Sequence, residues 1–490
     1  MGGWGMSSDW PRVRLGDHID SCLGKMLDKK KNKGIQQPYL GNSNVRWGEF
    51  DLSDLAQMKF EESEHERYGI TYGDLIVCEG GEPGRCAIWK AELPDMKIQK
   101  ALHRIRTKSS LNNRYLYYWF YHAGKHGLLE PYFTGTTIKH LTGRALNNLE
   151  IPLPPLSHQE FMAEVLGSLD DKIQLNHQTN QTLEQMAQAI FKSWFVDFEP
   201  VKAKIAALAA GGSEEDALLA AMQAISGKGE AELSRLQTEQ PEQYAELRAT
   251  AELFPSAMQD SELGEIPEGW EASQLGGYLD TLETGSRPKG GVSGITEGVP
   301  SVGAENIVGV GNYHYGKEKF VSVDFFNKLK RGIVEHLDCL LYKDGGKPGD
   351  FKPRVSMFGC GFPYNKLAIN EHVFRLRSQR LGQPYLYFLI GHERVLADLR
   401  HKGAKAAIPG INQTDVKTVW TVCPPREVLD IFNTIAEKSL TSILTRSKES
   451  LRLSKLRDTL LPKLLSGELS VSDNGNQPST EPLSPLQEIE

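Results

Sequence analysis

The sequence carries an internal repeat, so the fold must contain two copies of one unit. Three segments recur in the same order at offsets of 265 to 270 residues: 80–84 (Gly-Gly-Glu-Pro-Gly) as 345–349 (Gly-Gly-Lys-Pro-Gly), 115–118 (Tyr-Leu-Tyr-Tyr) as 385–388 (Tyr-Leu-Tyr-Phe), and 154–155 (Pro-Pro) as 424–425. Between the first two segments, His103 is loosely matched by His372. Matches in one order at nearly one offset indicate two diverged copies of one unit.

The first part of each copy reads as a mixture of strands and helices. Residues 75–78 and 87–89 flank the Gly-Gly-Glu-Pro-Gly turn, and 340–342 precede its counterpart. Short apolar runs beside a Gly/Pro turn predict β-strands. The aromatic segments 115–121 and 385–390 predict a short buried helix in each copy. The predicted fold class is therefore α+β, with two pseudo-repeated α/β domains.

The second part of the first copy predicts a long helix that follows the prolines at 152–155. Ser157 and Glu160 have the spacing of a capping box. Beyond them, ten residues recur at spacings of four and three, as in a coiled-coil seam: Met162, Leu166, Leu169, Ile173, Asn176, Asn180, Leu183, Ala187, Ile190 and Trp194.

The second copy carries a less regular helical pattern, in which Leu440, Leu444 and Leu451 lie at helical spacing. Pro462 is expected to kink or end this helix. A helix with an apolar stripe cannot bury it alone, so the simplest arrangement pairs the two helices in an antiparallel coiled coil. The predicted organisation has six segments: globular 1–155, helix 156–199, an Ala/Glu-rich helical spacer 200–264, globular 265–425, helix 426–470, and a disordered tail 471–490.

Composition is that of a globular protein without a membrane span. Hydrophobic residues make up 39% and charged residues 24% of the 490 residues. No apolar run has the length of a membrane helix, and the first residues lack the pattern of a secretory signal, so a cytoplasmic location is expected. The six cysteines include no C-x-x-C pair, which predicts reduced thiols and no zinc site.

The net charge of −7 is unevenly distributed along the chain. Residues 10–155 hold 21 Lys and Arg against 17 Asp and Glu, and residues 266–425 hold 20 against 16, so each block has a net charge of +4. Residues 156–265 hold 7 against 19, a net charge of −12. Two basic blocks are a weak sign of phosphate contact, and a charge of this size is also within ordinary scatter.

Motifs that would indicate catalysis are missing from the sequence. None of its Gly-Lys pairs is followed by Ser or Thr as in a phosphate-binding loop, and neither Pro-Pro pair fits an amino-methyltransferase motif. Asp-x-Lys patterns at Asp28 and Asp350 are interpreted as accidental. His103 and His372 are interpreted as structural. We expect no catalytic residue and no metal ligand in this chain.

Several longer segments resemble one known family, the specificity subunits of type I restriction-modification systems. The run 151–159 (Ile-Pro-Leu-Pro-Pro-Leu-Ser-His-Gln), followed by 169–173, 180–184 and 191–198 (Phe-Lys-Ser-Trp-Phe-Val-Asp-Phe), is similar to the family's central region. Residues 260–270 resemble its entry into a second recognition domain, and residues 456–468 resemble its closing helix.

The resemblance implies a non-catalytic protein that binds double-stranded DNA. Each globular part would be a target recognition domain that reads one half of a split, asymmetric site, and the helix pair would set the gap between the halves. The helices would also dock two methylation subunits, and two restriction subunits would complete the complex. S-adenosylmethionine, ATP and Mg would be bound by those partners, and no cofactor by this chain.

Candidate contact residues follow from the chemistry of DNA recognition, in which Arg, Lys, Asn and Gln read base edges and phosphates. In segments expected to be loops, the candidates are Asn44, Arg46, Arg85, Lys139 and His140 in the first domain, and Asn306, Lys347, Lys402, Lys405 and Asn412 in the second. Candidates for the coiled coil or for docking a partner are Leu169, Ile173, Asn176, Asn180, Leu183, Trp194, Phe195 and Phe198.

Two other functions fit parts of the sequence. A stand-alone DNA methyltransferase or nuclease would bind S-adenosylmethionine or cut DNA by itself, which the missing motifs disfavour. A coiled-coil scaffold that does not bind DNA would explain the helices, but not the two basic globular copies.

Overall fold

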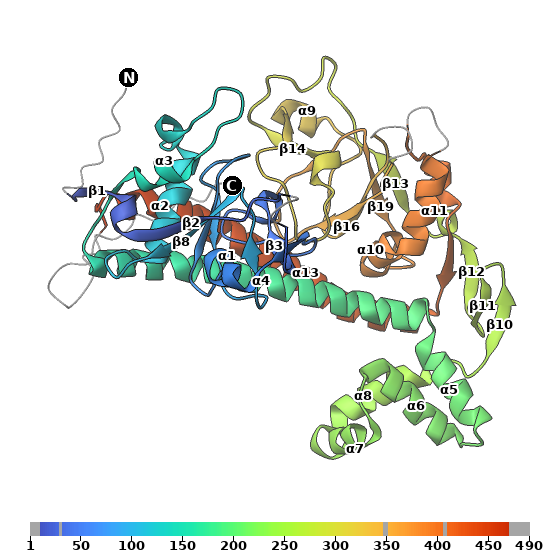
Figure 1. The fold of residues 1–490 in the computed structure, drawn as a ribbon. Coiled ribbons are helices and arrows are strands. Elements are labelled where there is room, and N and C mark those ends of the chain that lie inside the picture. Colours follow the sequence, from blue (N-terminus) through green and yellow to red (C-terminus); the bar gives the residue numbers. More distant parts are fainter. Residues whose placement is uncertain (1–9, 29–31, 346–350, 405–408, 470–490) are drawn as a thin grey trace. The chain divides into compact units, whose positions relative to one another are not determined.

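The computed structural model describes residues 10–28, 32–345, 351–404 and 409–469, and the chain forms two compact units. The first unit comprises residues 1–172 and 453–490, and the second comprises residues 173–452. Each unit holds one globular part and a portion of both long helices, α4 (Leu156–Phe195) and α13 (Arg426–Leu465) (Figure 1). The unit limits fall inside the helices, so the six segment boundaries predicted from the sequence stay predictions.

The globular part of the first unit contains two sheets and a strand pair. A four-stranded antiparallel sheet has the order β2-β8-β5-β6, and a three-stranded sheet has the order β4-β3-β7 with β3 and β7 parallel. The strands are Arg12–Arg14 (β1, paired with β9), Ile19–Leu23 (β2), Ile35–Leu40 (β3), Gln57–Phe60 (β4), Leu75–Cys78 (β5), Cys86–Ile88 (β6), Lys97–Ile98 (β7), Leu102–Thr107 (β8) and Glu150–Pro152 (β9). The helices are His65–Tyr68 (α1), Asn113–Lys125 (α2) and Gly143–Asn147 (α3).

The globular part of the second unit repeats this topology. Its four-stranded sheet has the order β13-β19-β16-β17, its three-stranded sheet has the order β15-β14-β18 with β14 and β18 parallel, and β12 pairs with β20. The strands are Glu271–Gln274 (β12), Thr281–Thr284 (β13), Val299–Val302 (β14), Lys319–Val321 (β15), Asp338–Tyr342 (β16), Val355–Phe358 (β17), Ala368–Ile369 (β18), Val373–Arg377 (β19) and Trp420–Cys423 (β20). The helices are Val323–Asn327 (α9), Gln383–Gly391 (α10), Glu393–Gly403 (α11) and Gln413–Lys417 (α12). The predicted repeat and the predicted α+β class are therefore confirmed.

One buried ion pair occurs at the same place in both sheets. Asp74 directly precedes β5 and is bound by Arg106 on β8, with Nε to Oδ1 at 2.8 Å. Asp338 begins β16 and is bound by Arg377 on β19, with Nη1 to Oδ1 at 2.7 Å. Both carboxylates are almost fully buried, at 2% and 0% exposure. A buried carboxylate is stable only when it is paired, so each pair fixes how its sheet assembles.

Two tyrosines also make equivalent bonds. The Tyr115 hydroxyl on α2 donates to the carbonyl oxygen of Pro152, and the Tyr385 hydroxyl on α10 donates to that of Val422, both at 2.7 Å. Each bond ties the predicted buried helix to the last strand before a long helix. Burial raises the pKa of both tyrosines, which keeps these hydroxyls protonated as donors.

The pairing register corrects the match of His103 with His372. The residue three positions after Asp74, on β5, pairs with His103. The residue three positions after the equivalent Asp338, on β16, pairs with Phe374. The true counterpart of His103 is therefore Phe374, two residues beyond His372. His103 is buried, and this burial lowers the pKa of its imidazole, whereas His372 is exposed in a turn.

The start of α4 differs from the predicted capping box. The helix begins at Leu156, so Ser157 lies inside its first turn and does not cap it. Gln159 instead binds two nearby segments of the same polypeptide. Its buried side-chain amide accepts from the backbone N–H of Asn112 and donates to the carbonyl of Pro154. This side chain anchors the helix to the loop before α2.

The end of α13 also differs from the prediction, because the helix does not end at Pro462. The helix continues to Leu465, three residues further. Gly467 then adopts a left-handed conformation with φ of 76°, as glycines after helix ends commonly do.

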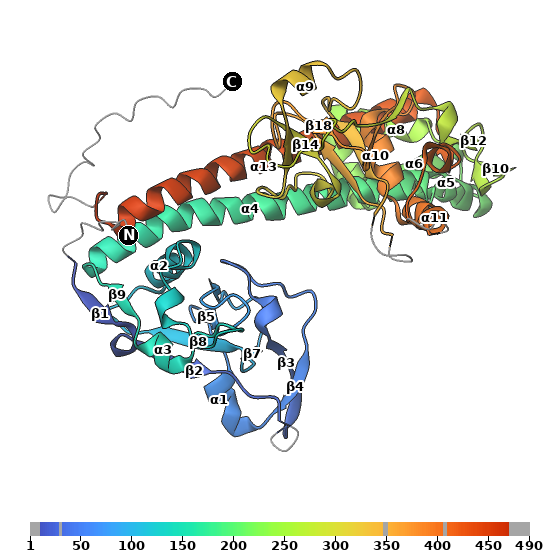
Figure 2. The same cartoon turned by 90° about the horizontal axis from the view of Figure 1, so that it is seen from above.

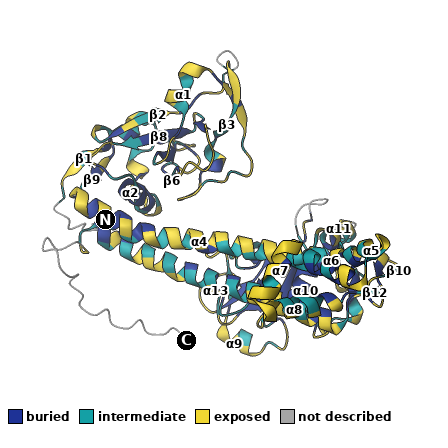
Figure 3. Cartoon of the chain, turned by 90° about the horizontal axis from the view of Figure 1, so that it is seen from below, coloured by how far each residue is buried: buried dark blue, intermediate teal, exposed yellow. Residues whose placement is uncertain are grey.

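The two long helices pair antiparallel. In the second unit, the Asn176 amide donates to Ser450 Oγ at 3.2 Å, and the Asn180 amide donates to Ser447 Oγ at 3.1 Å. In the first unit, Arg457 binds Asp170 at 2.7 Å. The partner numbers fall as the α4 numbers rise, which gives opposite directions. The ribbon seen from above shows both helices (Figure 2), and buried and exposed residues alternate along α4 (Figure 3).

The spacer after α4 forms helical pieces, as predicted. They are Glu199–Ala209 (α5), Glu214–Ser226 (α6), Glu230–Glu239 (α7) and Pro241–Glu252 (α8), followed by the hairpin of Met258–Ser261 (β10) and Gly264–Pro267 (β11). Within the described ranges, no helix is long and apolar enough to cross a membrane. The predicted disordered tail lies outside the described residues.

The repeated ion pair gives a first prediction. Asp338→Ala removes the buried carboxylate from Arg377, which keeps an ion pair with exposed Glu335 at 3.0 Å. The expected cost is roughly 2–3 kcal/mol, below the loss when a buried charge is left unpaired. Hydrogen exchange measured by mass spectrometry should then become faster in β16 and β19. Asp74→Ala should do the same in β5 and β8, whereas exposed Asp324→Ala should change neither sheet. Unchanged exchange in both sheets would show that the pairs do not stabilise them.

Candidate nucleic-acid interface

In the first unit, three loops meet beside the glycine turn 80–84. Arg85 ties the turn to the loop at Asn42, because its Nη2 donates to the Asn42 carbonyl at 2.9 Å. The backbone N–H of Leu141 donates to the Glu79 carbonyl at 2.7 Å, which brings the segment with Lys139 next to the same turn. The sequence-predicted residues Arg46, Arg85, Lys139 and His140 therefore belong to one loop cluster.

The side chains of this cluster differ in how freely they could contact a phosphate. Arg46 and Lys139 are exposed and make long ion pairs, with Asp51 at 3.5 Å and Glu130 at 3.4 Å, and Arg46 Nη1 also donates to the backbone carbonyls of Ser43 and Val45. Arg85 is turned inward, and its guanidinium holds the loops together. Surface ion pairs of this kind contribute little, so Arg46 and Lys139 can exchange their carboxylates for a phosphate.

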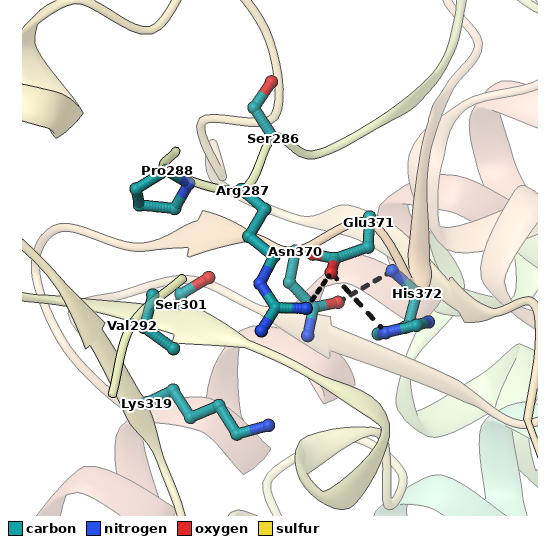
Figure 4. Close-up of a pocket in the computed structure, with 9 residues that line it drawn as sticks. All are labelled: Ser286, Arg287, Pro288, Val292, Ser301, Lys319, Asn370, Glu371 and His372. Carbon is teal, nitrogen blue, oxygen red and sulfur yellow. Dashed lines mark hydrogen bonds and ion pairs between the residues drawn. The ribbon is translucent and has the colours of Figure 1, made fainter. Parts of the chain in front are cut away.

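In the second unit, a pocket opens between four segments of the chain (Figure 4). It is lined by Ser286, Arg287, Pro288 and Val292 from the loop after β13, by Ser301 of β14 and Lys319 of β15, and by Asn370, Glu371 and His372 from the turn before β19. Three of these side chains carry or can carry a positive charge, and one carries a negative charge. Glu371 Oε1 lies 3.3 Å from Arg287 Nη1 and 3.7 Å from His372 Nε2.

Two predicted DNA contacts have a structural role in this conformation. Asn44 is buried, and its amide donates to the carbonyls of Asp51 and Asp54 at 2.9 Å each. Asn306 is fully buried, and its amide donates to the carbonyl of His314. Both asparagines end equivalent 3-10 turns that begin after a glycine, so both close a loop and do not present an amide to DNA.

The remaining candidates of the second domain have mixed positions. Lys402 lies on α11 and not in a loop, and its ammonium binds Asp398 at 2.7 Å. Asn412 is exposed, but its carbonyl oxygen caps α12 by accepting from two backbone N–H groups. Lys347 and Lys405 lie outside the described residues.

Part of the predicted docking set is buried within the second unit. Leu169, Ile173 and Leu183 are half-buried along the helix pair, together with Asn180 and the buried Asn176. Trp194, Phe195 and Phe198 pack against Phe254, Trp270, Tyr385 and Phe432. These three aromatic side chains form a core and cannot anchor a partner in this conformation.

Sequence reasoning missed Arg287 and Lys319. The signal was the loop 285–294, in which Arg287 and Lys289 are interleaved with Gly285, Gly290, Gly291 and Gly294. Glycine-rich basic loops commonly present backbone N–H groups and cations to phosphates.

Metal binding finds no support in the described ranges, where no group of three or more His, Cys, Asp or Glu side chains is placed to hold an ion. Of the two Asp-x-Lys patterns, Lys30 and Asp350 lie outside those ranges. The chemistry of the described surface is therefore charge and hydrogen bonding.

One half-buried carboxylate connects the helix pair to the second globular part. The Tyr387 hydroxyl on α10 donates to Glu184 Oε1 on α4 at 3.1 Å. Burial raises the pKa of Glu184 above its usual value, although the bond from Tyr387 opposes this shift. Glu184 is thus an ionisable group whose state depends on the packing of α10 on α4.

Comparison with known proteins identifies one family throughout. The family model for the type I restriction modification DNA specificity domain matches residues 7–185. The specificity subunit of the type I restriction enzyme HindI from Haemophilus influenzae is 32% identical over 346 residues, which cover 68% of this chain and 72% of that protein. The MjaIX specificity subunit from Methanocaldococcus jannaschii is 24% identical over 408 residues, which cover 82% and 78%. A crystal structure of the type I S subunit from M. genitalium aligns over 94% of this chain and 97% of that one, with 14% identity and a TM-score of 0.49.

The second prediction concerns Glu184. Because the pKa of folded Glu184 is raised, the stability it contributes is fully present below pH 4.5 and is lost as the pH rises through the folded pKa. At pH 7 the ionised, half-buried carboxylate therefore costs stability, and Glu184→Gln should remove that cost while still accepting from Tyr387. We expect the melting temperature to rise by about 2–4 °C per kcal/mol recovered.

Thermal melting at pH 7 and near pH 4.5 tests this expectation. The gain should be present at pH 7 and shrink toward pH 4.5, whereas exposed Glu160→Gln should give no such difference. A variant that melts lower than the parent protein at pH 7 would contradict it.

Proposed function

Because the chain belongs to the family of type I restriction enzyme specificity subunits, we propose that its two repeated globular parts are recognition domains that each read one half of a split DNA site. Subunits of this family are the non-catalytic, DNA-specificity components of type I restriction-modification complexes, and they bind DNA and assemble with other subunits. The family and the DNA-recognition role are established by the relatives. The half-site assignment is our proposal.

The duplicated topology is the observation that carries this proposal. Both sheets, the strand pair before each long helix, the buried Asp–Arg pair and the tyrosine bond occur twice. Two readers in one chain favour a bipartite site. The pairing of α4, which follows the first reader in the sequence, with α13, which follows the second, favours a fixed gap. Because the loops differ between the copies, the two halves of the site would differ in sequence, which makes the site asymmetric. The substrate, host DNA, would place the protein in the cytoplasm.

The helix pair is the proposed platform for two methylation subunits. Met186 on α4 is 56% exposed and Leu456 on α13 is 47% exposed. Their numbers differ by 270, the offset of the repeat, so they hold equivalent positions in the two units. Two equivalent exposed apolar side chains suit two copies of one partner. They replace the buried Trp194, Phe195 and Phe198 as candidate anchors. Two restriction subunits would join the complete complex, and S-adenosylmethionine, ATP and Mg would be bound by the partners.

The third prediction tests this platform. Met186→Asp and Leu456→Asp should each remove one methylation subunit from the complex, because a charge opposes burial against an apolar partner. The mass of the co-purified complex, measured by native mass spectrometry, should fall by one subunit for each variant and by two for the double variant. Gln185→Asp adds the same charge beside Met186 on an exposed polar position and should keep both subunits. A double variant that still binds both subunits would exclude these positions.

The fourth prediction tests the half-site assignment. The chain is co-expressed with the methylation subunit of its host, and methylated adenines are mapped across the genome by sequencing. Exchange of residues 10–155 for those of a relative should change one half of the methylated motif and leave the other half and the gap unchanged. The reciprocal exchange of 266–425 should change only the other half.

Deletion of the chain provides the control for this experiment. Loss of the motif on deletion is expected for a specificity subunit. Methylation that persists without the chain would reject the reading role and favour a scaffold that does not bind DNA. A motif that changes in both halves after one exchange would reject two independent readers.

A further inference from the structure

We propose that the pocket of Arg287, Lys319 and His372 binds a phosphodiester group of duplex DNA and so holds the backbone beside the half-site of the second domain. The inference rests on the proposed DNA-reading function and adds to it a specific contact site. The ligand of this pocket would be the phosphate backbone and not a base edge.

The cationic side chains of the pocket come from three separate segments. Arg287 follows β13, Lys319 begins β15, and His372 lies in the turn before β19. Within the described ranges, Lys319 has no hydrogen-bond or ion-pair partner, and its side chain is exposed. Figure 4 shows the Lys319 and Arg287 side chains on the same pocket. An unpaired cation beside a second cation attracts an anion, and DNA offers one negative charge per phosphate.

Glu371 controls the charge of the pocket. A second carboxylate, Asp344, lies with Oδ1 2.5 Å from His372 Nδ1, and Glu371 forms an ion pair with Arg287, with Oε1 3.3 Å from Nη1. The pair therefore keeps Arg287 directed into the pocket while DNA is absent. A phosphate must compete with Glu371 for Arg287, so this carboxylate weakens binding and prevents the pocket from holding every anion that it meets.

The glycine-rich loop beside the pocket leaves room for a backbone approach. Gly290 and Gly294 have φ of 90° and 82°, which other residues rarely adopt, and a Cβ on either would meet no atom within 4 Å. Glycine is thus favoured at these positions by the positive φ angle of the backbone, and not because neighbouring atoms leave no room for a side chain. Open space above a loop of left-handed glycines allows a phosphate oxygen to reach its N–H groups.

The equivalent place in the first unit does not form this pocket. The parallel pairing of Leu40 with Ile98 matches that of Val302 with Ile369, which fixes the equivalent positions. Tyr39, Ala56 and Ala101 stand there in place of Ser301, Lys319 and His372. Lys25, next to the glycine that matches Gly285, is buried and bound to Glu64. The phosphate contact is therefore a property of the second domain alone.

The test measures DNA binding by the full chain. A fluorescent duplex of about four helical turns (~40 base pairs) is titrated by anisotropy at salt concentrations between about 50 and 200 mM. Arg287→Ala and Lys319→Ala should each weaken binding about tenfold, the contribution of one charged hydrogen bond. Each should also make the plot of log affinity against log salt shallower by about 1, and by the same amount for duplexes of unrelated sequence.

Two further variants separate the pocket from general charge effects. Glu371→Gln should strengthen binding, because it frees Arg287. Arg235→Ala, which removes an exposed arginine paired with Glu239 at the same 3.3 Å on α7, should leave the affinity and the slope unchanged. Arg287→Lys keeps the charge and should keep the slope even if Arg287→Ala perturbs the loop.

The outcomes distinguish this inference from the function on which it rests. A double variant of Arg287 and Lys319 that binds with the parent slope would overturn the pocket and leave the DNA-reading function intact. Binding lost for one duplex sequence only would also overturn it, because that result indicates base reading. A parent chain that binds no duplex at any salt concentration would overturn both.

Discussion

The pairing of α4 with α13 is the contact on which both halves of the chain depend. Each helix is 40 residues long and has an apolar stripe that it cannot bury alone. Asn176 and Asn180 interrupt the stripe, and each finds a serine on the partner helix. A shift of one turn toward the start of α13 would place Asn180 opposite Ile443 or Leu444, which leaves its amide without a partner and is costly. The polar pairs thus lower the gain from burial but disfavour a shift in that direction.

The two globular parts are fastened to this helix pair by different chemistry. In the first unit, Asp170 and Arg457 form an ion pair that also binds tyrosine hydroxyls of α2. At the positions 270 residues away, Leu440 and Ala187 lie in one buried apolar cluster of the second unit. Ion pairs are weakened by salt, and apolar contacts respond much less. The attachment of the first part should therefore be the more sensitive to salt concentration.

Much of the fold could be predicted because apolar residues recur at helical spacing in the sequence and because whole segments are repeated in it. The helix pair, the buried helices and the duplicated strands follow from such spacing. The match of His103 with His372 failed because the two histidines lie two positions apart in the aligned strands, and a local comparison matches residue identity without the pairing register. The sequence left open whether Trp194 docks a partner or lies in a core, because its covering residues, Phe254 and Phe432, are remote in sequence.

The candidate DNA contacts were harder to predict because one residue type serves two purposes. Asparagine closes tight turns and also reads adenine, so Asn44 and Asn306 fit both roles until their burial is known. Arg287 and Lys319 lie far apart in the sequence, and only the pairing of β14 with β15 places Lys319 opposite Ser301 in the pocket. The repeat search could not find them, since the first copy has no counterpart.

Duplication with divergence of this kind is what an asymmetric site requires. Gly24 and Gly285 both pack so closely that a Cβ would meet the carbonyl of Ile98 or Ile369, so the scaffold is the same at this point in both copies. Directly beside these glycines the side chains differ, with a buried Lys25 in one copy and an open basic pocket in the other. Two identical copies related by twofold symmetry would read a palindrome. One chain with a shared scaffold and unlike loops can present two different surfaces at a fixed spacing, and a protein built from identical subunits cannot do so.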